Sequence, residues 1–233
     1  MATHFTPAAL KFLRDLKRNN DRDWFQPRKE IFERELKTPM LALISEITHA
    51  MEDFAPDHVR PPQKILFRIY RDTRFSNDKR PYKEHIGAWW VRAGLEKTSG
   101  AGFYFHLSGK ELLIAAGCYM PQPEQLLAVR RYLLDHHAEM RKLYTAKPLV
   151  KLFPHDEATS LTRPPKGFPA DHPAIDLIRN KQWGRSVTLP ADTALTPAVG
   201  KEIAKRFKAI APLVTLINTP LLPQKRKPLF GLN

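Results

Sequence analysis

The spacing of apolar residues predicts helices over the first part of the chain. Across residues 6–51, apolar side chains recur at intervals of three and four, which is typical of amphipathic helices that pack on a core. Thr6 and Pro7 suit the start of the first helix, because Thr caps helix N-termini and Pro is tolerated at the first helical position. We expect a second helix capped by Asp21 and a third that begins at Pro39.

The middle of the chain changes to a spacing of two, which predicts β-strands. The first strand is expected to begin at Lys64 and to bury Ile65, Phe67 and Ile69 on one face. The stretch Ser108-Gly109-Lys110-Glu111 has the composition of a hairpin turn between two later strands. The later strands are expected over residues 86–92, 102–107 and 112–119.

The second half of the chain is expected to return mainly to helix. Helical spacing runs from Pro123 to about His136 and continues through Tyr144, and the proline-rich stretch 161–173 predicts a loop. Strands grouped between helices, with short connections, indicate an α+β fold. We expect an antiparallel sheet of about four to six strands, flanked by N-terminal and C-terminal helices. The remaining elements are a short helix over 174–180, a strand over 183–189 and a helix over 197–211.

Length and composition narrow the class of protein. The 233 residues suffice for a single α+β domain, which we place at residues 1–222, followed by a basic and flexible tail at 223–233. The single cysteine, Cys118, excludes an internal disulfide and a multi-cysteine zinc site. No apolar run reaches the roughly 18 residues of a membrane span, and the N-terminus lacks the pattern of a signal peptide. We therefore expect a cytoplasmic protein with no membrane association, no metal and no cofactor, and no sequence feature indicates its oligomeric state.

The charge of the chain favours an anionic partner. The net charge is +14 and the isoelectric point is near 10, although Lys and Arg that merely solvate the surface would give the same values. Residues 64–83, called the basic segment below, carry seven basic and two acidic side chains. Guanidinium groups hold phosphate or carboxylate through a planar fork, so we expect this segment to form a basic cleft for a phosphate-bearing ligand, either nucleic acid, a nucleotide or another anionic ligand. Its candidate ligand-binding residues are Arg68, Arg71, Arg74, Lys79 and Lys83.

Two alternatives to nucleotide or nucleic-acid binding remain open for the basic segment. In the first, the protein is an enzyme acting on a small anionic substrate, in which Arg68 and Arg71 hold the anion and a neighbouring group transfers a proton. The candidates for that proton transfer are Asp72 and Tyr82, although Tyr82 also suits a packed aromatic residue. In the second, Asp72 and Asp78 pair the arginines in a structural network of a structural or partner-binding protein.

Histidines and tryptophans beside the basic segment supply further candidates. His85 follows the segment directly and is a third catalytic candidate, and His106 lies within a predicted strand. Neither belongs to a metal-binding spacing, and the chain has no phosphate loop or nucleophile elbow. Trp89 and Trp90 are adjacent in a predicted strand, so one ring is expected on each face of the sheet. An exposed ring there is suited to stacking on a base or a sugar.

Three blocks of the sequence resemble those of a known family. The first is Asn19-Asn20 followed by Trp24-Phe25, the second lies within residues 67–83, and the third is Arg163-Pro164-Pro165-Lys166-Gly167-Phe168. Over about residues 5–216 the chain resembles the bacterial and fungal family catalogued as domain of unknown function 2461. The resemblance implies a single-domain protein whose three blocks belong to one unit, and it contributes no catalytic residues. A site at which the blocks converge would add four ligand-binding candidates, namely Asn20, Trp24, Arg163 and Lys166.

Overall fold

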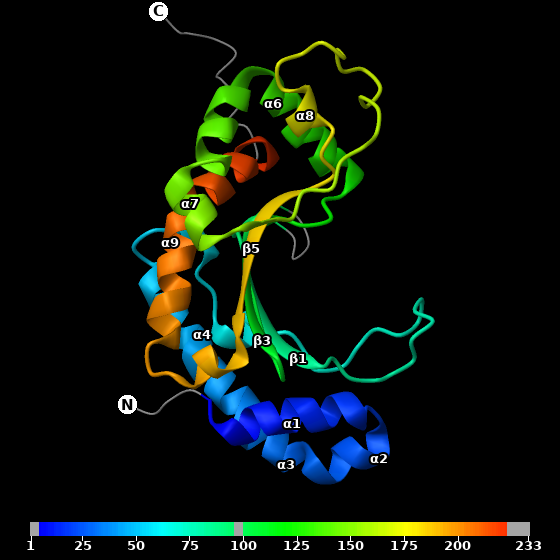
Figure 1. The fold of residues 1–233 in the computed structure, drawn as a ribbon, viewed down its shortest axis with the longest axis vertical. Helices are drawn as coiled ribbons and strands as arrows, with labels where there is room; N and C mark the ends of the chain where they lie inside the picture. Colours follow the sequence, from blue (N-terminus) through cyan, green and yellow to red (C-terminus); the bar gives the residue numbers. More distant parts are fainter. Residues whose placement is uncertain (1–4, 96–99, 223–233) are drawn as a thin grey trace, which may run out of the picture.

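The computed structural model, which describes residues 5–95 and 100–222, has an α+β architecture built on one antiparallel sheet. The strands are β1 (His85–Val91), β2 (Gly102–Ser108), β3 (Glu111–Cys118), β4 (His155–Asp156) and β5 (Trp183–Pro190). Their order across the sheet is β1-β2-β3-β5-β4, and every neighbouring pair is antiparallel. Helices precede and follow the sheet, so the predicted fold class is confirmed (Figure 1).

The helical elements before the sheet follow one another without a break over residues 22–51. They are α1 (Pro7–Arg18), α2 (Arg22–Phe25), α3 (Lys29–Phe32), α4 (Thr38–Met51) and α5 (Pro62–Ile65), with the 3₁₀-helical turns η1 (Gln26–Arg28) and η3 (Pro56–His58) and the π-helical segment η2 (Glu33–Lys37). The carboxylate of Asp21 caps α2 by accepting a hydrogen bond from the Trp24 amide at 2.7 Å, as predicted. Pro27 lies in η1, where its missing N–H tightens the helix without ending it. The predicted second and third helices therefore run together.

Of the predicted helices in the second half, the first ends at Tyr144 as expected, the second is shorter than predicted, and the last extends beyond its predicted end. The helices there are α6 (Pro123–Tyr144), α7 (Lys147–Leu152), α8 (Ile175–Ile178) and α9 (Val199–Asn218), with the turns η4 (Ala191–Leu195) and η5 (Thr219–Leu221). His136 has non-helical dihedral angles and marks a kink in α6. The first stretch of helical spacing was expected to end at about this residue. Pro212 lies inside α9, which continues through it to Asn218 because almost the whole last turn is buried.

The two faces of the sheet have different surroundings. Alternate side chains of β1, β2 and β3 are buried against α9, which in turn packs on α4. Within this core the Trp90 indole donates a hydrogen bond to the Thr48 hydroxyl at 2.9 Å. Figure 1 shows α4, α7 and α9 on one side of the sheet, and no helix among the residues described covers the other. The uncovered face, called the open face below, carries the polar and aromatic side chains that alternate with the buried ones along the strands.

The strand that was expected to begin at Lys64 is not formed, and this prediction was wrong. The residue belongs to α5, because the prolines at 61 and 62 set the backbone for a helical turn. The chain after it first makes a single bridge to the edge strand, between Leu66 and Ala88 of β1, and then folds back on itself. The Phe67 amide donates to the Gly87 carbonyl at 2.9 Å, and the Arg71 amide donates to the Pro81 carbonyl at 2.8 Å. Only isolated bridges result, so a spacing of two also occurs in a segment that pairs locally.

The domain prediction of residues 1–222 stays a prediction, and the predicted tail at 223–233 lies outside the described residues. Buried apolar residues from both halves of the chain form a common core cluster. Among the helices in the described ranges, none combines the length and apolar character needed to cross a membrane.

Candidate functional site

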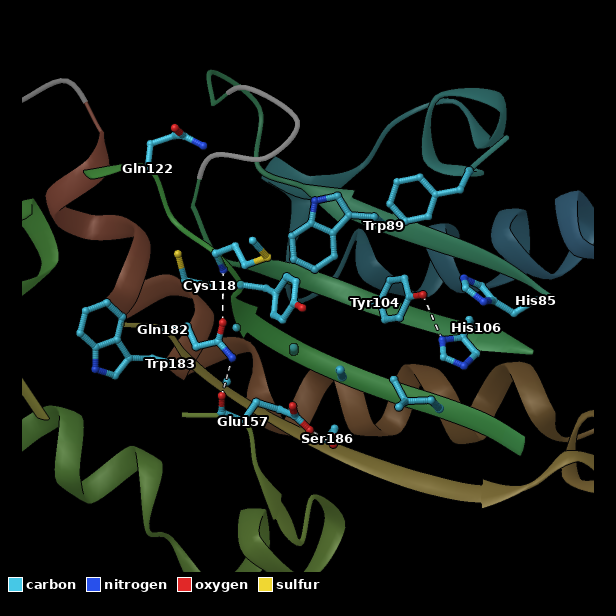
Figure 2. Close-up of a pocket in the computed structure, with 18 residues that line it drawn as sticks. His85, Trp89, Tyr104, His106, Cys118, Gln122, Glu157, Gln182, Trp183 and Ser186 are labelled. Atoms are coloured by element: carbon cyan, nitrogen blue, oxygen red, sulfur yellow. Dashed lines mark hydrogen bonds between the residues drawn. The ribbon is translucent and has the colours of Figure 1, made fainter. Parts of the chain in front are cut away.

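The open face of the sheet holds a cavity of about 720 Å³. Its floor comes from β3 and β5, and its walls come from β1, β2 and the segments that follow β3 and β4 (Figure 2). Ala115, Gly117 and Gly184 form the floor, so no side chain larger than a methyl group rises from these three positions. At Gly117, φ is +140° and a Cβ atom would lie 2.2 Å from the Trp183 carbonyl oxygen, so only glycine fits this position.

Aromatic rings form one wall of the cavity. Trp89 and Tyr104 are paired across β1 and β2, with ring centroids 6.3 Å apart. The Phe67 ring, from the basic segment, lies 6.2 Å from that of Tyr104. Trp90, next to Trp89 in β1, is fully buried on the opposite face, so the two rings lie on opposite faces as predicted. The wall therefore offers flat, mainly apolar surfaces on which a ring can stack.

Two histidines lie at one end of the cavity and are neutral at pH 7. The rings of His85 and His106 are 4.5 Å apart, and burial lowers the pKa of each to about 4. The Tyr104 hydroxyl lies 3.0 Å from His106 Nδ1, and Glu111 Oε1 lies 3.7 Å from His106 Nε2. A carboxylate only accepts, so Glu111 favours a proton on Nε2, and Nδ1 then accepts the hydrogen bond from Tyr104. Burial also raises the pKa of Tyr104 far above its usual value.

The opposite side of the cavity is a polar corner made of Glu157, Gln182 and Ser186. The Ser186 hydroxyl donates to Glu157 Oε1. The Gln182 side-chain nitrogen donates to the Glu157 carbonyl at 2.6 Å, and its oxygen accepts from the Met120 amide at 3.4 Å (Figure 2). Met120 has a positive φ of 49°, an uncommon conformation for this residue type. Glu157 forms no ion pair with any residue that the structure describes.

The basic segment lies beside this cavity, but its charges are largely paired within the segment. Arg71 and Arg80 both contact Asp78, with N···O distances of 2.6 and 2.7 Å, and Arg74 contacts Asp72 at 2.7 Å. The Arg74 guanidinium lowers the pKa of Asp72 to about 2. These pairs are mostly exposed, and such pairs contribute little to stability. They hold the shape of the loop rather than leave a cluster of free cations.

The two lysines of the candidate set also contact the loop itself. Lys79 donates to the Thr73 carbonyl at 3.0 Å, and Lys83 donates to the Arg68 carbonyl at 2.6 Å. Arg68 differs from the other arginines of the segment, because it has no ion pair within the described part of the chain. Its side chain is exposed, and its charge helps to lower the pKa of Asp72. It also directly follows Phe67, which lines the cavity.

Asn20 and Tyr82 meet in a structural contact rather than a pocket. The Asn20 side chain donates to the Tyr82 carbonyl and accepts from the Tyr82 amide, both at 3.0 Å. The Tyr82 ring is fully buried and stacks on Phe25 with centroids 4.1 Å apart. Its hydroxyl approaches Gln26 without the geometry of a hydrogen bond, and burial raises its pKa. Trp24 is half-buried beneath Arg28, whose guanidinium carbon lies 4.7 Å from the ring centroid.

Arg163 and Lys166 are exposed in the predicted loop between β4 and α8. This loop, drawn in yellow, lies at the opposite end of the molecule from α1 and α2 (Figure 1). The structure therefore joins the first two sequence blocks through Asn20, Phe25 and Tyr82, and it does not bring the third block to them.

Comparison with known proteins agrees with the resemblance in the sequence. The family described as Conserved hypothetical protein (DUF2461) matches residues 8–216. The chain belongs to this family. No curated protein and no solved structure matches it. In this DUF2461 chain the first block fastens the end of the basic segment, and the second block builds the paired loop and contributes Phe67 to the cavity.

Sequence reasoning singled out some residues of the DUF2461 cavity and missed others. His85 was noted because it directly follows the basic segment, and His106 and the adjacent tryptophans were noted for their position in predicted strands. His85, His106 and Trp89 do line the cavity. The polar corner was missed, because its three residues are ordinary in their own segments and β4 was not predicted. Ser186 lies within the strand predicted over 183–189, but only the pairing of β5 with β3 shows which face of the sheet it joins.

Proposed function

We propose that this protein binds a small organic molecule with a planar ring system in the cavity of the open face. The observation that carries the proposal is a cavity of about 720 Å³ lined by Phe67, Trp89 and Tyr104 above a floor of alanine and glycine. Cavities of about 300–1,000 Å³ with apolar walls and a few polar groups are typical of small-molecule sites. The ring is expected to stack on Trp89 and Tyr104, with the small floor residues admitting it to the sheet.

The charges of the cavity support a ring rather than a phosphate in its interior. None of the described residues that line it is Lys or Arg, and the two histidines are neutral because burial lowers the pKa of each to about 4. A phosphate placed there would lose its hydration without a cation to replace it.

Binding of a fragment library followed by tryptophan fluorescence tests this proposal. Ring-containing hits are expected to change the emission of Trp89, and Ala115→Phe is expected to abolish binding because the new ring fills the cavity from its floor. Trp24→Phe serves as the control, since Trp24 lies on α2 and does not line the cavity. Unchanged affinity of the hits for folded Ala115→Phe would show that they bind elsewhere.

A phosphate-bearing ligand, nucleic acid or nucleotide, is the second candidate, and Arg68 is the observation that favours it. This arginine is exposed, has no ion pair within the described residues, and follows Phe67 at the edge of the cavity. An anionic group of a ligand would meet a guanidinium group there that no carboxylate within the described residues holds in an ion pair.

We expect Arg68→Ala to weaken the binding of ATP or of a single-stranded oligonucleotide about tenfold at low salt, measured by fluorescence anisotropy. Wild-type affinity should fall steeply with added salt. Arg163→Ala is the matched control, since it removes an equally exposed arginine from a distant loop. Equal effects of the two substitutions would leave only nonspecific attraction by the net charge.

Proton transfer between Tyr104 and His106 receives no support from the cavity. Burial raises the pKa of Tyr104 and lowers that of His106, so a proton on the tyrosine is strongly favoured over one on the histidine. Their hydrogen bond fits a fixed pair of neutral groups that orient a ligand.

A further inference from the structure

We infer that the ligand carries a cationic nitrogen, such as a protonated amine or amidine, which binds at the polar corner of Glu157, Gln182 and Ser186. The inference deepens the proposed function and rests on it. Its first support is the carboxylate of Glu157, which faces the cavity without an ion pair among the described residues. Ser186 occupies one of its oxygens, so the carboxylate retains acceptor capacity toward the cavity.

The polar corner is preorganised for such a group. Gln182 uses both ends of its amide, donating to the Glu157 carbonyl and accepting from the Met120 amide. The Glu157 amide donates to the Gly184 carbonyl at 2.9 Å, which extends the pairing of β4 with β5 and fixes the backbone from which the carboxylate projects. A carboxylate held in this way loses little side-chain freedom when a cation binds.

The sheet register sets the distance between the two ends of the ligand. Tyr104 is paired with Ala115, and Ala115 is paired with Ser186, so two strand spacings of about 4.8 Å each separate the ring wall from the polar corner. The ligand therefore needs a ring and a nitrogen roughly 10 Å apart, joined by a slim chain over Ala115. Figure 2 shows Tyr104 and Ser186 on opposite sides of this floor.

The charge of the corner selects against anions. The protein as a whole is strongly basic, with a net charge of +14, yet Glu157 is the only Asp, Glu, Lys or Arg among the described residues that line the cavity. An ammonium group gains a charge-assisted hydrogen bond there, whereas a ligand carboxylate meets a like charge in partly dry surroundings.

Three matched compounds test the inference: a 2-naphthyl group on a four-carbon chain that ends in an ammonium, a hydroxyl or a carboxylate group. Calorimetry on the full chain is expected to give about tenfold or greater preference for the ammonium compound over the alcohol, with the carboxylate weakest. Glu157→Gln, which keeps the shape of the side chain, is expected to remove the preference for ammonium and to leave the alcohol unchanged. Glu139→Gln is the control, since it removes an exposed carboxylate on α6 that does not line the cavity, and it should keep the preference.

The outcomes separate this inference from the proposed function. Equal affinity for the three compounds, or a preference that survives in Glu157→Gln, would overturn the inference. If Ala115→Phe still abolishes that binding, the cavity remains a ligand site. Absence of binding by all three, or binding that Ala115→Phe does not affect, would overturn the inference together with the cavity as the site of these compounds.

Discussion

Acidification from pH 7 to pH 4 is expected to unfold the protein, because three histidines are buried in their neutral form. His58, His85 and His106 each have a pKa lowered from 6.5 to about 4, and in each case burial is the largest cause. Neither ring nitrogen of His58 forms a well-aligned hydrogen bond, although the nearby Ala101 backbone opposes part of the shift. A proton on any of these rings therefore binds the unfolded chain more tightly than the folded one.

The direction of the pH effect follows from the lowered pKa values. Above pH 6.5 both states hold the histidines neutral, and the free energy of unfolding has its full value. Between pH 6.5 and 4 the unfolded chain binds protons that the folded protein does not, so stability falls as the pH decreases. Each histidine contributes at most about 3 kcal/mol to this loss. The three together are comparable to the 5–15 kcal/mol that stabilises a typical domain.

Urea denaturation at a series of pH values measures this effect. His58→Phe keeps an aromatic ring beside Phe103. It is expected to reduce the number of protons taken up on unfolding by about one, and so to flatten the dependence of the free energy of unfolding on pH. His49→Ala is the control, since the His49 side chain is 84% exposed. A pH dependence that is identical in the two variants would mean that His58 does not titrate differently in the folded and unfolded states.

Asn218→Ala is expected to destabilise the protein by about 3 kcal/mol, because Asn218 satisfies a buried backbone amide and carbonyl at once. Its side chain accepts from the Ala101 amide at 2.8 Å and donates to the Ala101 carbonyl at 2.9 Å. Both residues are fully buried, so water cannot replace the two lost bonds. The contact joins the end of α9 to the start of β2, two elements 117 residues apart in sequence.

Asn20→Ala is the matched comparison for this prediction. Asn20 makes the same pair of hydrogen bonds to the backbone of Tyr82, but it is only partly buried. We therefore expect a smaller loss of about 1 kcal/mol, since water can reach the groups that are left. Thermal and urea unfolding of both variants measure the difference. Equal losses would indicate that burial does not control the contribution of this contact.

The order of helices and strands followed from spacing, because each regular element has its own period of apolar residues. The predicted strands over 86–92, 102–107, 112–119 and 183–189 all form, within one or two residues at their ends. The strand predicted from Lys64 did not form, since isolated bridges to β1 and to Tyr82 give the same alternation of side chains as a regular strand. The two-residue strand β4 carries no periodic signal and was missed for that reason.

The candidate site was predicted less well than the helices and strands, because it depends on contacts between side chains. Charge density drew attention to the basic segment, but sequence does not show which carboxylate an arginine contacts. Asp78 takes both Arg71 and Arg80, so much of that charge is used inside the loop. The cavity nearby depends on side chains from strands that are far apart in sequence, including Trp89 and Ser186.

The sequence by itself determined the α+β class, the family, and the two faces of each main strand, since these depend on local spacing and on blocks of neighbouring residues. The tertiary structure decided which face of the sheet the helices cover, where the cavity opens, and that Glu157 lies opposite Tyr104. The physical reason is that burial and ion pairing depend on strand order and on contacts across the sheet. Those contacts join residues such as Tyr104, Ala115 and Ser186, which no local pattern connects.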